Sequence, residues 1–200
     1  RVFSFFVFVI VGFGLIVSVL APDIIRVLAA PEYSSASKVV PLITLAYVIA
    51  SFQYHFNVNI LVAKKTSRIA AINLIAGASS LALNFLFVPV LGILGAALAT
   101  LLCMLTKVGL FWYFSTQFGA VVVEWRRVLL AFGLALSLYA LGAVIEPDSV
   151  VHSLLIHLLI VALYLPGMVI LRLIRFSDIL RLARAIADRL KTHRRFSGSR

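Results

Sequence analysis

The sequence predicts an all-α integral membrane protein, in which a bundle of six transmembrane helices is followed by a basic amphipathic helix. The first reason is composition, since 63% of the 200 residues are hydrophobic and only 12% are charged, about half the charged share of an average soluble domain. The second reason is that six apolar runs each approach the roughly 20 residues that a helix needs to cross a bilayer. A water-soluble domain, a disordered chain and a nucleic-acid-binding module are excluded, because none of them could hide this much apolar surface.

Each apolar run is expected to form a helix, because backbone N–H and C=O groups in lipid must find hydrogen-bond partners within their own segment. Five runs contain no charged residue, and the fourth run along the chain contains one, Lys107. The expected helices span residues 2–21, 39–63, 69–91, 92–116, 128–145 and 150–171. Together they make up one membrane domain, residues 1–173.

The connections between the expected helices are short, apart from residues 22–38. This stretch contains two prolines and three serines, so it is expected to be a loop on the outer side, either alone or with a short interfacial helix. Pro89 and Gly92 are expected to make the turn of a tight antiparallel hairpin between the third and fourth helices. Pro41 and Pro166 lie within apolar runs and are expected to kink those helices.

The positions of the basic residues predict the orientation of the bundle. Six crossings put both ends of the membrane domain on one side, and fifteen of the eighteen Lys and Arg residues fall on that side. Arg26 and Lys38 fall on the other side, which also carries four of the seven acidic residues. Because cytoplasmic loops are enriched in Lys and Arg, both ends are expected in the cytoplasm. The net charge of +11 is thus explained by orientation, and no nucleic acid is expected as a partner.

Residues 174–200 differ from the rest of the chain in charge and in periodicity. Ser177 is a suitable N-cap for a helix whose apolar residues recur at helical spacing. The basic residues expected to bind the membrane surface are Arg181, Arg184, Arg189 and Lys191. Such a helix is expected to lie on anionic lipids of the cytoplasmic leaflet, and residues 192–200 are expected to be disordered. The alternative is a solvated tail without a partner.

Lys107 is the first candidate for a functional residue, because a charge at mid-bilayer costs about 2.5–3.5 kcal/mol on insertion scales. It lies at the edge of a stripe of small residues, which suits a face packed against another helix better than one facing lipid. Lys107 therefore either faces a cavity, where water or an anionic ligand stabilises its charge, or extends its long side chain toward the cytoplasmic interface. The sequence leaves both alternatives open.

Asn73 and Asn84 are the next candidates for a substrate cavity. With Gly77 and Ser80 they form a stripe on one face of the expected helix 69–91, within about 60° of arc. Polar side chains on such a stripe either hydrogen-bond to a neighbouring helix, which is the commoner use, or line an aqueous cavity. The first alternative is favoured here.

Three further cavity candidates lie in the expected helix 39–63, namely Gln53, His55 and Asn57. Gln53 and Asn57 share one face of this helix, whereas His55 lies on another. One face is expected to meet a cavity and the other a packed helix. His55 and His157 are also candidates for proton-linked roles, although a lone buried histidine is more often a structural hydrogen-bonding group.

The sequence lacks the motifs of common enzymes. It has no Gly-rich phosphate loop, no His-Glu-x-x-His motif and no Gly-x-Ser-x-Gly motif. A single cysteine, Cys103, excludes a disulfide framework and a cysteine zinc site. No acidic residue lies in any of the six apolar runs. We therefore expect no enzymatic activity, no catalytic residue, no metal and no cofactor.

Three stretches carry a resemblance to a known family. Residues 28–36 look like a Leu-Phe-Gly-x-x-Tyr-x-x-Ala loop with two alanines in place of Phe and Gly, and residues 63–66 are similar to a Gly-Lys-x turn without its Gly. Asn73 and residues 84–100, Asn-Phe-Leu-Phe-Val-Pro-Val-Leu-Gly-Ile-Leu-Gly-Ala-Ala-Leu-Ala-Thr, resemble Asn-x-x-Leu-Ile-Pro-x-Phe-Gly-Ile-x-Gly-Ala-Ala-x-Ala-Thr. These motifs are typical of the polysaccharide transporter family, the flippases of O-antigen and exopolysaccharide repeat units. That family belongs to the same superfamily as the multidrug and toxin extrusion transporters.

The resemblance implies a fold and a function. The six helices would be the C-terminal lobe of a longer transporter, in which two bundles enclose a cavity that opens alternately to either side of the bacterial inner membrane. The cargo would be an undecaprenyl-pyrophosphate-linked oligosaccharide for surface polysaccharide or lipopolysaccharide synthesis. Lys107 would then be suited to the pyrophosphate. Polysaccharide assembly proteins would be further partners.

Two other functions remain open at this point. One is a multidrug or metabolite exporter of the same superfamily, against which the absence of acidic residues from the apolar runs argues. The other is a membrane scaffold that does not transport and that binds glycan-assembly enzymes through its basic tail. Deletion of residues 177–200 would separate them, because a scaffold would lose its partners whereas a flippase would keep most of its transport.

Overall fold

The computed structural model describes residues 2–28, 36–119, 123–145 and 150–171. Within these ranges the chain is helical and contains no strand. The helices are α1 (Val2–Leu28), α2 (Val40–Ala50), α3 (Gln53–Val62), α4 (Thr66–Leu91), α5 (Ile93–Phe118), α6 (Trp125–Val144), α7 (Val150–Ala162) and α8 (Tyr164–Ile170).

Six helical segments of the described chain are long and apolar enough to cross a membrane. The first, third, fourth and fifth crossings are α1, α4, α5 and α6, whereas α2 with α3 makes the second and α7 with α8 makes the sixth. The prediction of six membrane-length helices is therefore confirmed. The predicted amphipathic helix and tail, with Arg181, Arg184, Arg189 and Lys191, lie outside the described residues.

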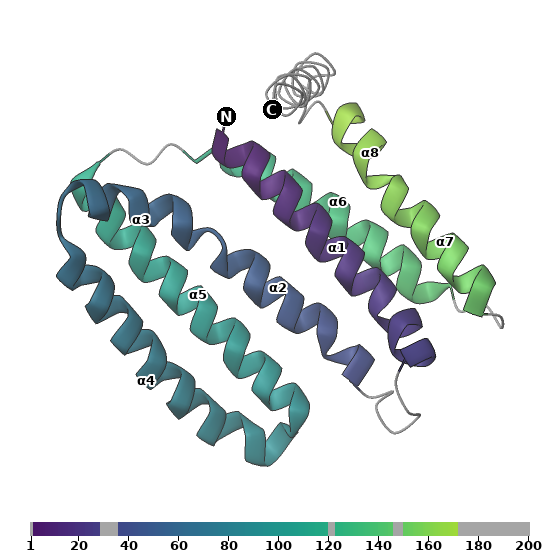
Figure 1. Ribbon diagram of the computed structural model, residues 1–200, viewed down its shortest axis with the longest axis horizontal. Helices are drawn as coiled ribbons and strands as arrows, with labels where there is room; N and C mark the ends of the chain where they lie inside the picture. The colour runs from purple at the N-terminus through teal and green to yellow at the C-terminus, as the bar shows by residue number, and fades with distance from the viewer. Residues whose placement is uncertain (1, 29–35, 120–122, 146–149, 172–200) are drawn as a thin grey trace, which may run out of the picture.

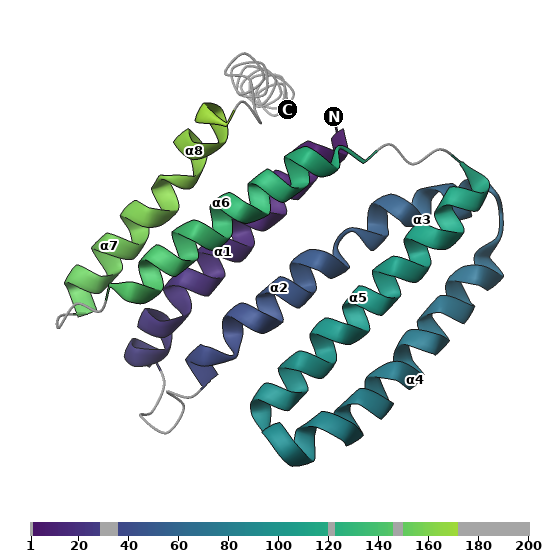
Figure 2. The same cartoon turned by 180° about the vertical axis from the view of Figure 1, so that it is seen from behind.

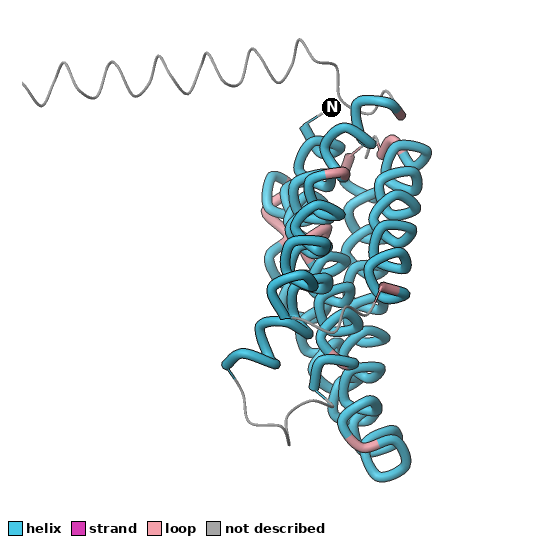
Figure 3. Tube along the Cα trace, turned by 90° about the vertical axis from the view of Figure 1, so that its right-hand side faces the viewer, coloured by secondary structure: helices cyan, strands magenta, loops and turns pink. Residues whose placement is uncertain are grey.

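The crossings form an elongated assembly of two groups (Figure 1). One group consists of α1, α6 and the α7–α8 crossing, and the other of the α2–α3 crossing, α4 and α5. Seen from behind, α6 lies against α1 (Figure 2), and the side view shows all crossings running along one common direction (Figure 3). The two groups meet mainly where α1 packs against α2. Helix α1 is central, with more than half of its membrane segment buried, whereas α4 is almost entirely exposed.

Helix α1 is longer than expected, because it continues through Pro22 and Asp23 to Leu28. The expectation that residues 22–38 form a loop is therefore wrong for residues 22–28. Proline removes one backbone donor, but its fixed φ is helical, and membrane helices tolerate it where the freed carbonyl finds another partner. Arg26 in the last turn favours the helix as well, because a cation interacts well with the negative end of the helix dipole.

The two interrupted crossings have different causes. Pro166 has no N–H to donate to Ala162, which fits the break between α7 and α8 at Leu163. Pro41 lies in the first turn of α2, where it starts the helix and does not kink it. The break between α2 and α3 instead follows Ser51, whose hydroxyl donates to the Val48 carbonyl oxygen at 2.6 Å, a kind of bond that competes with the helical ladder.

The hairpin between α4 and α5 turns at Gly92 as the sequence predicts, whereas Pro89, which is also expected in the turn, lies inside α4. Gly92 connects the helices with φ +56°, a conformation that residues with a Cβ adopt only with strain. A Cβ at Gly95 would clash with the backbone carbonyl of Phe87, so the glycine is what lets the two helices approach. Farther along, the Cys103 thiol donates to the Ala76 carbonyl oxygen at 3.2 Å.

Candidate functional site

An apolar groove lies between α1, α2 and α6, at the junction of the two groups of helices. Its volume is about 650 Å³, within the usual range for small-molecule sites. Leu15 of α1, Val48 of α2 and Phe132 of α6 are typical of its mainly aliphatic and aromatic walls. The groove follows α6 from Leu129 to Tyr139, which is about 15 Å at the helical rise and about half the thickness of a bilayer core.

The two ends of the groove differ. Lys38 is exposed and lines the end where α2 begins. Toward the other end Phe132 meets an aromatic cluster, because its ring lies edge-on to Phe52 with centroids 6.2 Å apart, and Phe52 in turn meets Phe3 at 5.6 Å. Lys38 thus lies at one end of the groove, and an aromatic cluster lies toward the other end, where α1 and α6 begin.

Two glycines set the width of the groove. A Cβ at Gly14 of α1 would lie 2.7 Å from the Val48 side chain, so this glycine lets α1 approach α2 closely. Gly133 of α6 is different, because a Cβ there would meet no atom within 4 Å. Gly133 therefore leaves space in the groove that a larger side chain would fill.

A smaller polar cavity adjoins the groove. Its volume is about 100 Å³, and its walls come from α1, α6 and α7. Ser18 of α1 and Tyr139 of α6 line both spaces. The two spaces therefore share a wall, and a movement of α1 or α6 at that wall would alter both.

Three buried polar side chains lie at this cavity, namely Asp23 of α1 with Ser153 and His157 of α7. Their exposed fractions are 1%, 2% and 6%. The Ser153 hydroxyl donates to Asp23 Oδ1 at 2.6 Å, and His157 Nδ1 lies 2.5 Å from Asp23 Oδ2. The other ring nitrogen, Nε2, lies 3.4 Å from the Gly142 carbonyl oxygen of α6. The carboxylate thus ties α1 to α7, and the imidazole adds a contact to α6.

This cluster does not have the geometry of a serine hydrolase. In such enzymes the imidazole stands between the carboxylate and the hydroxyl, so that one ring nitrogen removes the hydroxyl proton. Here Ser153 donates to the carboxylate itself, and His157 Nε2 faces a carbonyl oxygen. The arrangement is suited to holding a charge or a proton and not to activating a nucleophile.

The cluster corrects one expectation from the sequence. Asp23 lies inside the membrane-length segment Phe3–Leu28, so the expectation that no acidic residue occupies a membrane helix is wrong. The misleading signal is Pro22, because a proline at the end of an apolar run predicts the end of the helix. Two signals could have revealed the site: the apolar residues that resume after Asp23, and the four-residue spacing of Ser153 and His157, which puts both on one helix face.

The candidates predicted on α4 and α5 line neither space. Lys107 is half-buried on α5, and Asn73 is exposed on α4. Asn84 is half-buried, and its amide donates to the Ser80 carbonyl oxygen of its own helix at 2.8 Å. A Cβ at Gly77 would meet no atom within 4 Å, so the favoured packing of this stripe against a neighbouring helix does not occur at Gly77 within the described residues.

The candidates on α3 are also absent from the walls of both spaces. The His55 ring stacks on Phe3 of α1 with centroids 4.3 Å apart, which makes it part of the aromatic cluster toward one end of the groove. Gln53 and Asn57 are half-buried. The side-chain oxygen of Asn57 is buried and has no hydrogen-bond partner among the described residues.

Comparisons with known proteins add no assignment. No protein-family model matches the chain, and neither a curated protein nor a solved structure is similar to it. Among the described residues, no three His, Cys, Asp or Glu side chains gather as they would around a metal ion. The features of the chain that bear on its function are therefore the groove, the polar cluster beside it and the sequence motifs.

Proposed function

We propose that the chain belongs to a membrane transporter that moves lipid-linked oligosaccharide repeat units across the bacterial inner membrane for surface polysaccharide synthesis. The observation that carries this proposal is the groove between α1, α2 and α6, which is mainly apolar along about half a bilayer and is lined at one end by Lys38. An apolar wall suits a polyprenyl chain, and a lysine at that end suits the phosphate to which that chain is attached. The sequence motifs around residues 84–100 support the same cargo.

The arrangement of the helices is compatible with alternating access. The two groups of crossings meet mainly at α1 and α2 and at the aromatic cluster of Phe3, Phe52 and Phe132. The resemblance implies that the transport cavity lies between this six-helix lobe and a second bundle. Within the six helices, a rotation of one group against the other would separate these rings and alter access to the groove. Lys107, Asn73 and Asn84 remain candidates for contacts made in another state.

Substitution of Gly133 tests this proposal. A phenylalanine at Gly133 projects into open space in the groove, whereas the same change at Gly77 projects from the exposed α4, where a Cβ also meets no atom within 4 Å. We expect purified Gly133→Phe in vesicles to translocate a fluorescent polyprenyl-pyrophosphate oligosaccharide at least tenfold more slowly than Gly77→Phe, with equal amounts of inserted protein. Wild-type translocation no faster than in protein-free vesicles, or equal rates for the two variants, would contradict the proposal.

One observation favours a second candidate function, a proton-coupled exporter of amphipathic small molecules. Exporters of this kind use acidic residues within the membrane to bind the coupling ion, and Asp23 is such a residue. The same vesicles distinguish the two functions. Efflux of a lipophilic dye along a pH gradient, without translocation of the lipid-linked glycan, would establish the exporter in place of the flippase.

A further inference from the structure

We infer that Asp23, Ser153 and His157 form a proton-binding site that holds α7 against α1 while the proton is bound and releases α7 when the proton leaves. The site joins α1 to α7 through Asp23 and His157, which lie 134 residues apart in sequence. It is enclosed, since each of the three side chains is at most 6% exposed, and it adjoins the polar cavity of about 100 Å³. Proton binding itself is independent of the proposed function, whereas its coupling to the groove rests on that function.

The hydrogen bonds fit the protonated histidine. When both ring nitrogens carry a proton, Nδ1–H donates to Asp23 Oδ2 at 2.5 Å and Nε2–H faces the Gly142 carbonyl oxygen at 3.4 Å. The second carboxylate oxygen accepts from Ser153 at 2.6 Å. Every polar atom of the three side chains then faces a suitable partner, and the carboxylate and imidazolium form a pair without net charge.

Loss of the proton makes this arrangement unfavourable. If Nδ1 keeps its proton for Asp23, the bare Nε2 lone pair faces the Gly142 carbonyl oxygen, and two acceptors repel each other. The pair also loses the imidazolium charge that compensates Asp23 at hydrogen-bond distance, which is costly among buried groups in a medium of low dielectric constant. Water entering between α1 and α7 relieves both effects. We therefore expect α7 to move away from α1 on deprotonation.

The surroundings of the site support a proton rather than a metal ion as its ligand. Asp23 is the one carboxylate that lines the cavity among the described residues, which supplies too few anionic oxygens for a calcium ion. The other titratable or charged side chains that line the cavity are Arg26 of α1 and Tyr139 of α6. Neither offers an anionic oxygen near neutral pH.

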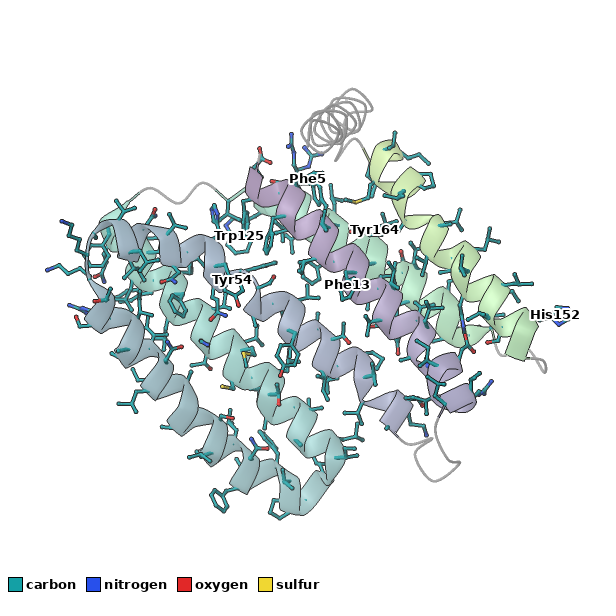
Figure 4. All side chains as sticks on the ribbon, in the orientation of Figure 1. Phe5, Phe13, Tyr54, Trp125, His152 and Tyr164 are labelled. Atoms are coloured by element: carbon teal, nitrogen blue, oxygen red, sulfur yellow. The ribbon has the colours of Figure 1, made fainter. Side chains whose placement is uncertain are left out.

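The polar cavity and the groove have a wall in common, and this wall connects the proton-binding site to the groove. Ser18 and Tyr139 line both the polar cavity and the groove, so a separation of α7 from α1 would displace a wall of the substrate space. A second contact lies about two helical turns farther along this crossing, where the Tyr164 hydroxyl donates to the Phe8 carbonyl oxygen at 3.1 Å and Tyr164 is placed toward α1 (Figure 4). We therefore expect α7 to swing about the Tyr164 contact.

Distance measurements between spin labels test the inference without reference to transport. Labels on the exposed Val27 of α1 and Leu155 of α7, in a Cys103→Ser background in lipid nanodiscs, report the separation of the two helices. We expect a short distance at acidic pH and a longer one at alkaline pH, with a one-proton transition. His152→Gln is the matched control, since His152 is exposed and points away from the helices (Figure 4), and it should keep the transition.

Asp23→Asn and His157→Gln should each abolish the pH-dependent change in distance. If either variant fails to fold, ¹⁵N spectra of histidine-labelled wild-type protein give the answer alone, because the His157 ring should change protonation together with the distance. A wild-type distance that is constant with pH, or a transition that survives in His157→Gln, would overturn the inference. A normal transition in a protein that translocates no lipid-linked glycan would instead contradict the proposed function and leave the proton site standing.

Discussion

The carboxyl group of Asp23 is buried in a membrane-length helix, and the free-energy cost of this burial depends on the side chains that contact it. An unpaired acid is most unfavourable at the helix centre, where it costs about 2.5–3.5 kcal/mol on insertion scales, and Asp23 lies nearer the end of α1. Ser153 and His157 reduce this cost by engaging one carboxylate oxygen each. At the scale of single residues, the fold of the first group of helices therefore depends on polar contacts that join α1 to α7 as well as on apolar packing.

Removal of one of these contacts should have a measurable effect on stability. Ser153→Ala deletes the hydroxyl that donates to Asp23, and hydrogen bonds between membrane helices contribute about 0.6 kcal/mol on average and up to about 1.7 kcal/mol. We expect the free energy of unfolding in bicelles to fall by an amount in that range. Ser137→Ala is the control, because Ser137 is exposed and donates within its own helix. Equal losses for the two variants would show that the Asp23 contact contributes nothing.

At the scale of elements, the hairpin of α4 and α5 depends on glycines where the backbones approach. A Cβ at Gly95 would clash with the Phe87 carbonyl, which belongs to the backbone and cannot rotate away as a side chain does. Helix α4 has little other support, because it packs mainly on α5 and only slightly on α3. The stability of α4 therefore depends on how closely it approaches α5.

Gly95→Ala should consequently weaken the hairpin, whereas Gly77→Ala should not. Overpacking of a close contact costs about 1–3 kcal/mol, and we expect Gly95→Ala to lower the free energy of unfolding by that amount. Gly77 has open space around it, and alanine is a better helix former than glycine, so its variant should unfold at the same denaturant concentration as the wild type or higher. An unchanged Gly95→Ala protein would contradict the close approach of α4 to α5.

At the scale of the whole molecule, the sequence predicted the number of crossings but not their arrangement. Long apolar runs determine that six helical segments are long and apolar enough to cross a membrane, and Gly92 determines one hairpin, because both are local properties. The pairing of Asp23 with His157 joins residues 134 positions apart, and no local pattern encodes it. The groove is equally non-local, since α1, α2 and α6 each contribute one wall.

The predicted site residues also show that local sequence does not encode tertiary contacts. A polar side chain in an apolar run is recognisable from sequence, and this identifies Lys107 and Asn73. Which space such a side chain meets depends on tertiary packing, and in the structure neither lines the groove or the polar cavity. Asp23 escapes sequence-based prediction for the opposite reason, because Pro22 makes a helical residue look like part of a loop.

We predict that this chain crosses the membrane six times with its basic end in the cytoplasm, and the groove and the buried cluster lie within those crossings. Accessibility of single cysteines to a membrane-impermeant maleimide, in a Cys103→Ser background in intact cells, measures this topology. The exposed positions Leu28 and Val144 end α1 and α6, whereas Ser67 and Gln117 lie at the opposite end, in α4 and α5. We predict labelling of Leu28→Cys and Val144→Cys in intact cells, and of Ser67→Cys and Gln117→Cys only after permeabilisation. Labelling of all four from one side, or of two positions at the same end from opposite sides, would contradict the account.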